Sequence, residues 1–203
     1  MARKTKEEAN ETRDSILQAA VEVFYSQGVA KSSLEEIAEA AGVTRGAVYW
    51  HFKNKMDIFS ALYERMHVSV MEGLICRLDK DTENPLQDLI DFSVEFLKSI
   101  GNDGPYQKVF SLFSLKCDYS GEMAEFLQDQ IQKKEYCISE MKKSFDLAKV
   151  KNLLASNTDT HFLAISFFCY ISGISIESLR NPAMIDLDKN AAALVKRFFE
   201  TLK

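Results

Sequence analysis

The residues best suited to chemistry gather between positions 44 and 55, where the chain reads Thr-Arg-Gly-Ala-Val-Tyr-Trp-His-Phe-Lys-Asn-Lys. The guanidinium of Arg45 can bind a guanine edge or a phosphate, and the hydroxyl of Thr44 can donate to a phosphate oxygen. Tyr49 and His51 carry polar tips that suit phosphate or thymine-methyl contacts. Donors of this kind on one short segment are typical of a surface that binds nucleic acid.

The small and apolar residues of the same segment predict a helix that approaches its target closely. Gly46 and Ala47 leave room for the backbone at a groove floor, whereas Val48 and Phe52, four positions apart, are placed to pack inward. Lys55 falls at the start of the next helix, where its charge opposes the helix dipole. A bound phosphate would relieve that conflict and would also accept backbone N–H groups.

Two short helices must position these side chains. Ser33 and Glu36 match a capping box that starts the first helix, and Gly42 suits a turn with positive φ. Thr44 has the oxygen to cap the second helix, over Arg45–Phe52. Two short helices joined by a three-residue turn have the length and turn chemistry of a helix-turn-helix.

Composition favours helices along the whole chain. The 203 residues include 8 glycines and 3 prolines, too few turn formers for a many-stranded protein. A hydrophobic content of 46% and a charged content of 27% exclude a disordered chain. Hydrophobic periodicity and cap residues predict an all-α fold of about nine helices, at residues 8–27, 34–41, 45–52, 55–78, 85–100, 106–116, 121–147, 158–179 and 187–202.

The formal net charge of −5 argues against nucleic-acid binding until the charges are located. Residues 40–55 contain three basic residues and no acid, and residues 1–6 contribute a further +3 as a basic arm. Residues 1–55 are neutral in sum, so the whole −5 lies in residues 56–203. A neutral segment with two basic edges is compatible with binding to the phosphate backbone.

Residues 33–38 and 41–55 closely resemble the DNA-binding signature of TetR-family transcriptional regulators. Residues 1–6, with Glu11-Thr12-Arg13, are similar to the AcrR-type branch of that family, which represses multidrug efflux pump genes. Beyond about residue 60 the similarity narrows to short phrases, namely Lys116-Cys117-Asp118, Gly121-Glu122-Met123 and Tyr170-Ile171-Ser172-Gly173.

The resemblance implies an all-α homodimer that binds a palindromic double-stranded DNA operator. Residues 1–55 would form the DNA-binding helix-turn-helix domain, and residues 56–203 the ligand-binding and dimerisation domain. Trp50 stands where this branch also has tryptophan, and it either packs or touches phosphate. Ser33 can cap its helix and contact phosphate as well. By position in the motif, the residues expected at the DNA are Ser33, Thr44, Arg45, Gly46, Ala47, Tyr49, Trp50, His51 and Lys55.

Aromatic residues are plentiful in the predicted ligand domain, with twelve Phe and five Tyr among residues 56–203. Helical proteins bury most of their aromatic residues in the core, so a role in core packing is the alternative to ligand contact for each candidate. A subset can line a cavity for an aromatic or cationic effector through ring faces. Relatives often have tryptophan where Tyr63 stands, and some have an acid where His67 stands, so an acidic contact would have to come from Glu177 or Glu95. The ligand-binding candidates are Tyr63, Met66, His67, Phe92, Phe96, Phe110, Phe113, Gln130, Phe168 and Glu177.

The last two predicted helices carry small residues and apolar runs, which indicates a dimer interface of two helices from each partner. Packing within one chain is the alternative. The run Phe162–Ile176 is too short and too interrupted by serine to span a membrane, and the charged start does not resemble a signal peptide. We therefore expect a cytoplasmic protein with no membrane partner. Its four cysteines form no CxxC pair, and we expect them to be reduced and mostly buried.

The predicted function is transcriptional repression of a multidrug efflux operon, relieved when a small lipophilic or aromatic ligand binds the C-terminal domain. The sequence contains no Ser/His/Asp order, no metal-ligand cluster and no glycine-rich phosphate loop, so we expect neither an enzyme nor a cofactor. The alternatives are an activator, or a TetR-like regulator of metabolic genes that responds to a metabolite or a redox signal.

Overall fold

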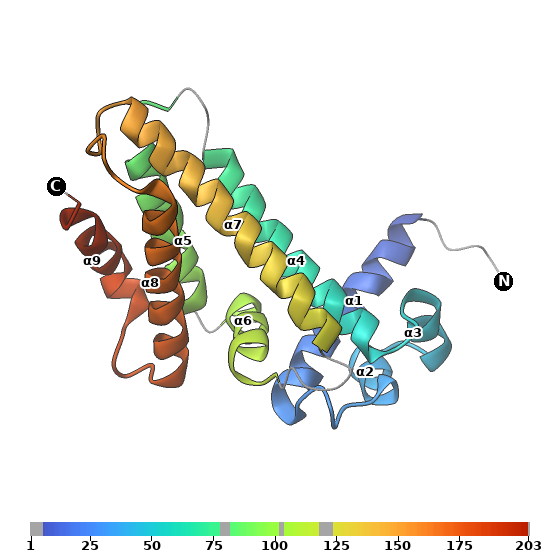
Figure 1. The fold of residues 1–203 in the computed structure, drawn as a ribbon. Helices are drawn as coiled ribbons and strands as arrows, with labels where there is room; N and C mark the ends of the chain where they lie inside the picture. Colours follow the sequence, from blue (N-terminus) through green and yellow to red (C-terminus); the bar gives the residue numbers. More distant parts are fainter. Residues whose placement is uncertain (1–5, 78–81, 102–103, 118–123, 203) are drawn as a thin grey trace. The chain divides into compact units, whose positions relative to one another are not determined.

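The computed structural model describes residues 6–77, 82–101, 104–117 and 124–202, and within these ranges the chain forms nine α-helices and no β-strand (Figure 1). The predicted all-α fold is confirmed. The basic residues Arg3 and Lys4 of the predicted arm, and the phrase at 121–123, lie outside the described residues. The helices are α1 (Lys6–Gln27), α2 (Leu34–Ala40), α3 (Arg45–His51), α4 (Lys55–Arg77), α5 (Pro85–Gly101), α6 (Pro105–Leu115), α7 (Ala124–Val150), α8 (Thr160–Arg180) and α9 (Leu187–Glu200).

The first of two compact units contains α1, α2, α3, the part of α4 up to Met66, and α6. Its core consists of apolar side chains that repeat at helical spacing and are fully buried, including Ile16, Phe24, Ile37, Val48 and Phe59. The rings of Phe24 and Phe59 pack edge to face, with centroids 6.3 Å apart. This core joins α1 to the two short helices that follow it.

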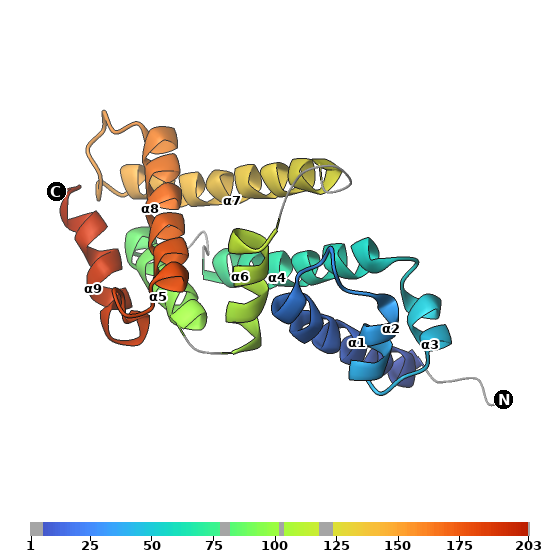
Figure 2. The same ribbon diagram turned by 90° about the horizontal axis from the view of Figure 1, so that it is seen from below.

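Two lysines hold α6 against α1 within the same unit, a contact that can be followed in Figure 2. The ammonium of Lys108 donates to both carboxylate oxygens of Glu22, at 2.6 and 2.8 Å. The ammonium of Lys116 donates to the Tyr25 carbonyl at 2.8 Å and lies 3.7 Å from the centre of the Tyr25 ring. Both contacts anchor the C-terminal half of α1.

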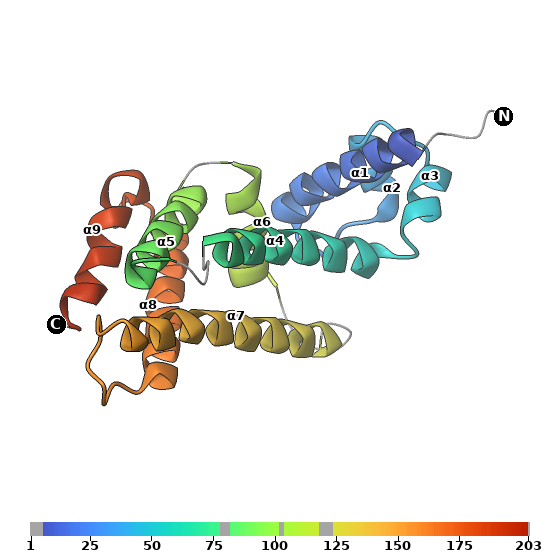
Figure 3. The ribbon, with the colours of Figure 1, turned by 90° about the horizontal axis from the view of Figure 1, so that it is seen from above.

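The second unit contains α5, α7, α8, α9 and the part of α4 that begins at His67. Helix α5 contacts α7, α8 and α9, and α8 also packs against α7 and α9 (Figure 3). Phe145 and Phe167 place their ring centroids 6.1 Å apart, and Phe167 and Phe199 place theirs 5.1 Å apart. These rings join α7, α8 and α9 in one aromatic cluster.

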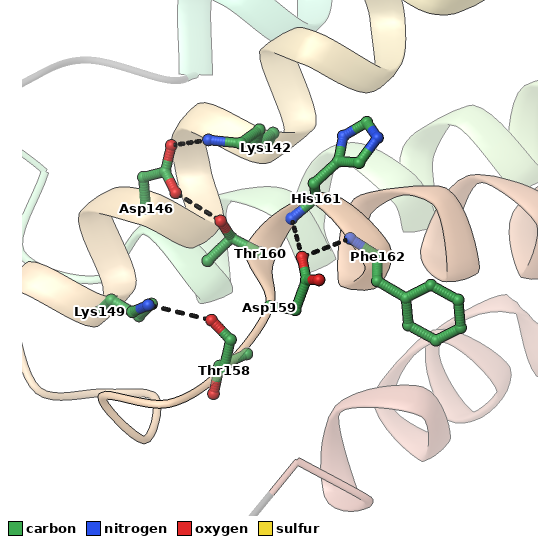
Figure 4. Close-up of polar contacts among 8 residues, drawn as sticks. All are labelled: Lys142, Asp146, Lys149, Thr158, Asp159, Thr160, His161 and Phe162. Carbon is green, nitrogen blue, oxygen red and sulfur yellow. Dashed lines mark hydrogen bonds and ion pairs between the residues drawn. The ribbon is translucent and has the colours of Figure 1, made fainter.

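A polar network joins the end of α7 to the start of α8 (Figure 4). The Asp159 carboxylate caps α8 by accepting the backbone N–H groups of its first turn. Asp146 accepts from the Lys142 ammonium and the Thr160 hydroxyl, both at 2.6 Å. Burial favours the neutral form of Asp146, but these two hydrogen bonds and the charges of Lys142 and Lys149 together lower the pKa of Asp146.

The structure differs from the sequence prediction at the cysteines, because only Cys137 is buried. Cys76 and Cys169 are exposed, and Cys117 is half-buried, so the expectation of mostly buried thiols is wrong. None of the four forms a disulfide in the structure. Burial raises the pKa of the Cys137 thiol to about 12, followed in importance by the charge of Glu140. Cys137 is therefore protonated at neutral pH.

Helix α8 has the length and composition of a membrane-spanning helix, because its 21 residues extend beyond the apolar run in the sequence. Its buried side includes Leu163, Phe167 and Ile171, and it faces neighbours in the second unit. On the opposite side Phe162 is 67% exposed.

Candidate nucleic-acid interface

Helix α2 begins with the capping box predicted from the sequence. The Glu36 amide donates to the Ser33 hydroxyl at 3.2 Å, and the Ser33 amide donates to the Glu36 carboxylate at 2.8 Å. Hydrogen bonds from the Ser33 and Gln27 side chains, with the Ser33 amide, lower the pKa of Glu36. The hydroxyl of Ser33 also donates to Glu36 at 2.9 Å, so Ser33 is held in place by its own helix.

The turn between α2 and α3 has the backbone that the sequence predicts. Gly42 adopts φ +66°, the left-handed region in which glycine is the least strained residue. The Gly42 amide donates to the backbone carbonyl of Glu39, and the Val43 amide donates to the backbone carbonyl of Ala38, both at 3.0 Å. The Ser15 hydroxyl of α1 donates to the Ala41 carbonyl at 3.3 Å, which ties α1 to this turn.

Helix α3 is capped and buried on one side only. The Thr44 hydroxyl accepts the Ala47 amide at 3.1 Å, which confirms Thr44 as the cap. Val48 is fully buried and Phe52 nearly so, as the four-residue spacing predicts. The guanidinium of Arg13 lies 5.2 Å from the centre of the Phe52 ring and covers it from α1.

The outer side of α3 exposes four of the residues predicted to meet DNA, whereas Ala47 and His51 are half-buried. Tyr49 is 46% exposed and Trp50 is 72% exposed, and Gly46 is exposed as well. His51 is half-buried, with its ring centroid 4.5 Å from that of Trp50 in an edge-to-face contact. Trp50 therefore packs against a neighbouring ring and not in the core.

Arg45 contacts two side chains on this surface, Glu35 and Tyr49. Its guanidinium lies 2.7 Å from the Glu35 carboxylate of α2 and donates to the Tyr49 hydroxyl at 3.3 Å. The Tyr49 ring also lies beneath the guanidinium, 5.3 Å from centroid to carbon. The hydrogen bond to Tyr49, and then the charge of Glu35, raise the pKa of Arg45. Glu35 is ten positions away along the chain, and only the folded turn brings it to Arg45.

Lys55 is also held by the protein. Its ammonium donates to the carbonyls of Ala30 at 2.9 Å and Ser32 at 3.2 Å, in the loop before α2. The side-chain oxygen of Asn54 accepts the Asp57 amide at 2.9 Å and so caps the start of α4. These loop carbonyls offset the repulsion between the Lys55 charge and the N-terminus of α4.

Four ligand candidates fall in the first unit. The rings of Tyr63 and Phe113 pack edge to face at 5.0 Å between centroids, and both side chains are buried. Met66 and Phe110 are half-buried. The structure therefore brings the candidates Tyr63 and Phe113 into direct contact.

Six ligand candidates fall in the second unit. The rings of Phe92 and Phe96 stack at 6.3 Å on α5, and Gln130 of α7 is buried. His67 and Phe168 are half-buried. Glu177 is exposed and forms an ion pair with Arg180 at 2.9 Å, so the structure does not place it in a buried acidic contact.

Two family models match separate parts of the chain. The model described as "Bacterial regulatory proteins, tetR family" matches residues 16–62, which contain α2 and α3. The model described as "MAATS-type transcriptional repressor, C-terminal region" matches residues 84–203. Each compact unit therefore contains residues that a family model matches.

Full-length similarities agree with these matches. The transcriptional regulator AcrR of Shigella flexneri is 36% identical over 98% of this chain and 93% of its own length. The structure of NalD, secondary repressor of the MexAB-OprM multidrug efflux pump in Pseudomonas aeruginosa, matches with a TM-score of 0.81 at 29% identity, over 97% of this chain and 98% of NalD. SmeT is a repressor of a multidrug efflux pump in Stenotrophomonas maltophilia. Its complex with triclosan matches with a TM-score of 0.87 at 27% identity, over 95% of this chain and 92% of SmeT. This chain belongs to the TetR family of bacterial DNA-binding transcriptional regulators.

Proposed function

We propose that this protein is a cytoplasmic homodimer that represses a multidrug efflux operon and leaves its palindromic operator when a small lipophilic or aromatic ligand binds. The observation that carries the proposal is the similarity to AcrR, which extends over nearly the whole of both chains. NalD and SmeT, each named as an efflux-pump repressor, share the fold at more than 25% identity.

We assign operator binding to residues 1–55 and ligand binding with dimerisation to residues 56–203. The exposure of Arg45, Tyr49 and Trp50 on one side of α3 supports the first assignment. Arg45 reads a base edge or a phosphate, and Tyr49, Trp50 and His51 extend the contact along the groove. The capping residues Ser33 and Thr44 and the lysine Lys55 lie at helix starts, where phosphates bind well.

The effector is proposed to be lipophilic or aromatic because the candidate residues are mostly aromatic. Tyr63 packs edge to face with Phe113, and Phe92 stacks with Phe96. An aromatic ligand can make the same kinds of ring contact. SmeT has been solved in complex with triclosan, a chlorinated aromatic compound. Triclosan is therefore a suitable first probe for this protein.

The dimer is proposed to form through α8 and α9. Phe162, Cys169 and Gly173 are exposed along one side of α8. A chain that exposes an apolar helix side of this length commonly covers it with a second copy. Two helices from each protomer would then form a four-helix bundle.

The mechanism of release is geometric. The two recognition helices of a dimer must lie about one helical turn of DNA apart, roughly 34–36 Å, to enter successive major grooves. A ligand that favours another separation weakens operator binding, and by linkage the operator weakens ligand binding by the same factor.

The test uses the intergenic DNA beside the gene that encodes this chain. Fluorescence anisotropy of the labelled fragment is expected to show tight binding that triclosan weakens at least tenfold. A flanking, divergently transcribed efflux operon is the expected gene neighbourhood. A metabolic operon in that place, together with binding that no aromatic compound weakens, would contradict the proposal.

A further inference from the structure

We infer that Glu35 restrains Arg45, so that Arg45 contributes to binding of the operator and not to binding of other DNA. This inference rests on the proposed function. It concerns the selectivity of the DNA-binding surface, and it assigns a role to a residue that does not itself contact a base. Glu35 is a positioning residue that acts through Arg45.

The geometry places the Glu35 carboxylate in direct competition with DNA. Its oxygen lies 2.7 Å from one terminal nitrogen of Arg45, and the other terminal nitrogen donates to the Tyr49 hydroxyl. Both arms of the guanidinium fork are therefore occupied in the free protein. The same fork makes the bidentate contact to a guanine edge.

The pair is accessible to DNA, because the side chains of Arg45 and Glu35 are 60% and 51% exposed. An ion pair at such an exposed site is weak and can exchange partners. The Tyr49 ring supports the guanidinium from below, so Arg45 can leave Glu35 without losing its place on α3.

Exchange of Glu35 for a DNA partner is favourable only where the DNA group matches the two arms of the Arg45 guanidinium. A guanine edge offers two acceptors in the right geometry, so it can replace both contacts of Arg45. A phosphate in an arbitrary register only replaces one anionic partner of Arg45, the Glu35 carboxylate, by another. This exchange gains little, so Arg45 stays with Glu35 on non-specific DNA and adds no phosphate contact there.

The test compares Glu35→Gln with Glu39→Gln, a control that removes a carboxylate from an exposed position of the same helix. Two DNA duplexes are used. One is the sequence that the wild-type homodimer enriches from a random library, and the other is a mixed-sequence duplex of about three helical turns, roughly 30 base pairs. Circular dichroism and thermal unfolding confirm that each variant folds.

We expect Glu35→Gln to bind the mixed-sequence duplex at least about threefold more tightly than Glu39→Gln does, with a smaller change on the enriched sequence. The plot of log affinity against log salt for mixed-sequence DNA should become steeper by about 0.9 per protomer, since one more phosphate is contacted. Glu39→Gln should leave this slope unchanged. A merely structural role for Glu35 would not change the slope.

A double mutant shows whether Glu35 acts through Arg45. In the Arg45→Ala background, Glu35→Gln should have no more effect than Glu39→Gln. Equal effects of the two Gln variants in the wild-type background would overturn the inference and leave the proposed function intact. Failure of the wild-type protein to enrich any sequence would overturn both.

Discussion

The ammonium of Lys55, at the first residue of α4, donates a hydrogen bond to the carbonyl of Ala30 at 2.9 Å. A second hydrogen bond reaches Ser32 in the same loop. Lys55, which follows α3 in the chain, therefore holds the loop that leads into α2. The arrangement makes the start of α4 part of the structure that positions Ser33.

Replacing Lys55 by alanine should destabilise the protein. Two hydrogen bonds from a half-exposed ammonium are worth about 1 kcal/mol together, and a change of that size lowers Tm by roughly 2–4 °C in a chain of this length. Thermal unfolding measures the effect. Lys53→Ala is the matched control because Lys53 is exposed and donates only its backbone amide to Asp57. Equal stability of the two variants would show that the loop contacts of Lys55 contribute nothing.

Replacing Gly42 by alanine should destabilise the turn through its backbone alone. At φ +66° a Cβ would meet no atom within 4 Å, so the expected loss of about 1 kcal/mol is conformational strain. Gly46→Ala is the control, since its Cβ meets only the Thr44 hydroxyl at 3.9 Å and its φ is not positive. Urea unfolding should show a loss for Gly42→Ala and no loss for Gly46→Ala.

The helix boundaries near this turn could be predicted from the sequence because their determinants are local. Ser33, Thr44 and Asn54 each bond to an amide three positions away, and Gly42 has the positive φ that its residue type suggests. The partner of Arg45 could not be predicted in this way. Glu35 meets Arg45 only after the turn has folded, and α2 offers two other acids, Glu36 and Glu39.

Two features of the second unit also could not be predicted from the sequence, namely which side of α8 is exposed and where α7 ends. Cys169 has apolar neighbours along the chain, yet it falls on the exposed side of α8. Helix α7 continues to Val150, beyond the predicted end at Leu147, and Asn152 then adopts φ +59°. Asparagine tolerates this conformation better than most residues, but nothing local distinguishes this asparagine from others in the chain.

Asp146 should make stability depend on pH in the acid range. Its pKa in the folded protein is lower than the ordinary value of 3.8, so its contribution is full above that value and is lost as the pH falls through the folded pKa. Asp146→Asn should cost about 1 kcal/mol at neutral pH. Chemical denaturation of the variant and the wild type at several pH values should show this difference shrinking below about pH 4. A difference that stays constant into strong acid would contradict the role of Asp146.

Gly173 tests the proposed dimer. A Cβ there meets no atom within 4 Å in the protomer, so Gly173→Leu should leave the helix intact and even favour it. If α8 packs against a second copy, the added side chain should convert the dimer to a monomer. Analytical ultracentrifugation measures the change. Ser139→Leu, at an exposed position of α7, is the control and should stay dimeric. A Gly173→Leu dimer of wild-type affinity would place the interface elsewhere.

The most direct test of the proposed operator recognition is the discrimination that Arg45 provides. Affinity is measured by anisotropy for the sequence enriched by the wild-type protein and for mixed-sequence DNA, with Arg45→Ala beside the wild type. Because a bidentate contact to guanine is worth about 1–3 kcal/mol of discrimination, the ratio of the two affinities should fall roughly 5- to 150-fold for each such contact that is lost. The folded dimer should persist. An unchanged ratio in a folded, dimeric Arg45→Ala variant would contradict the account.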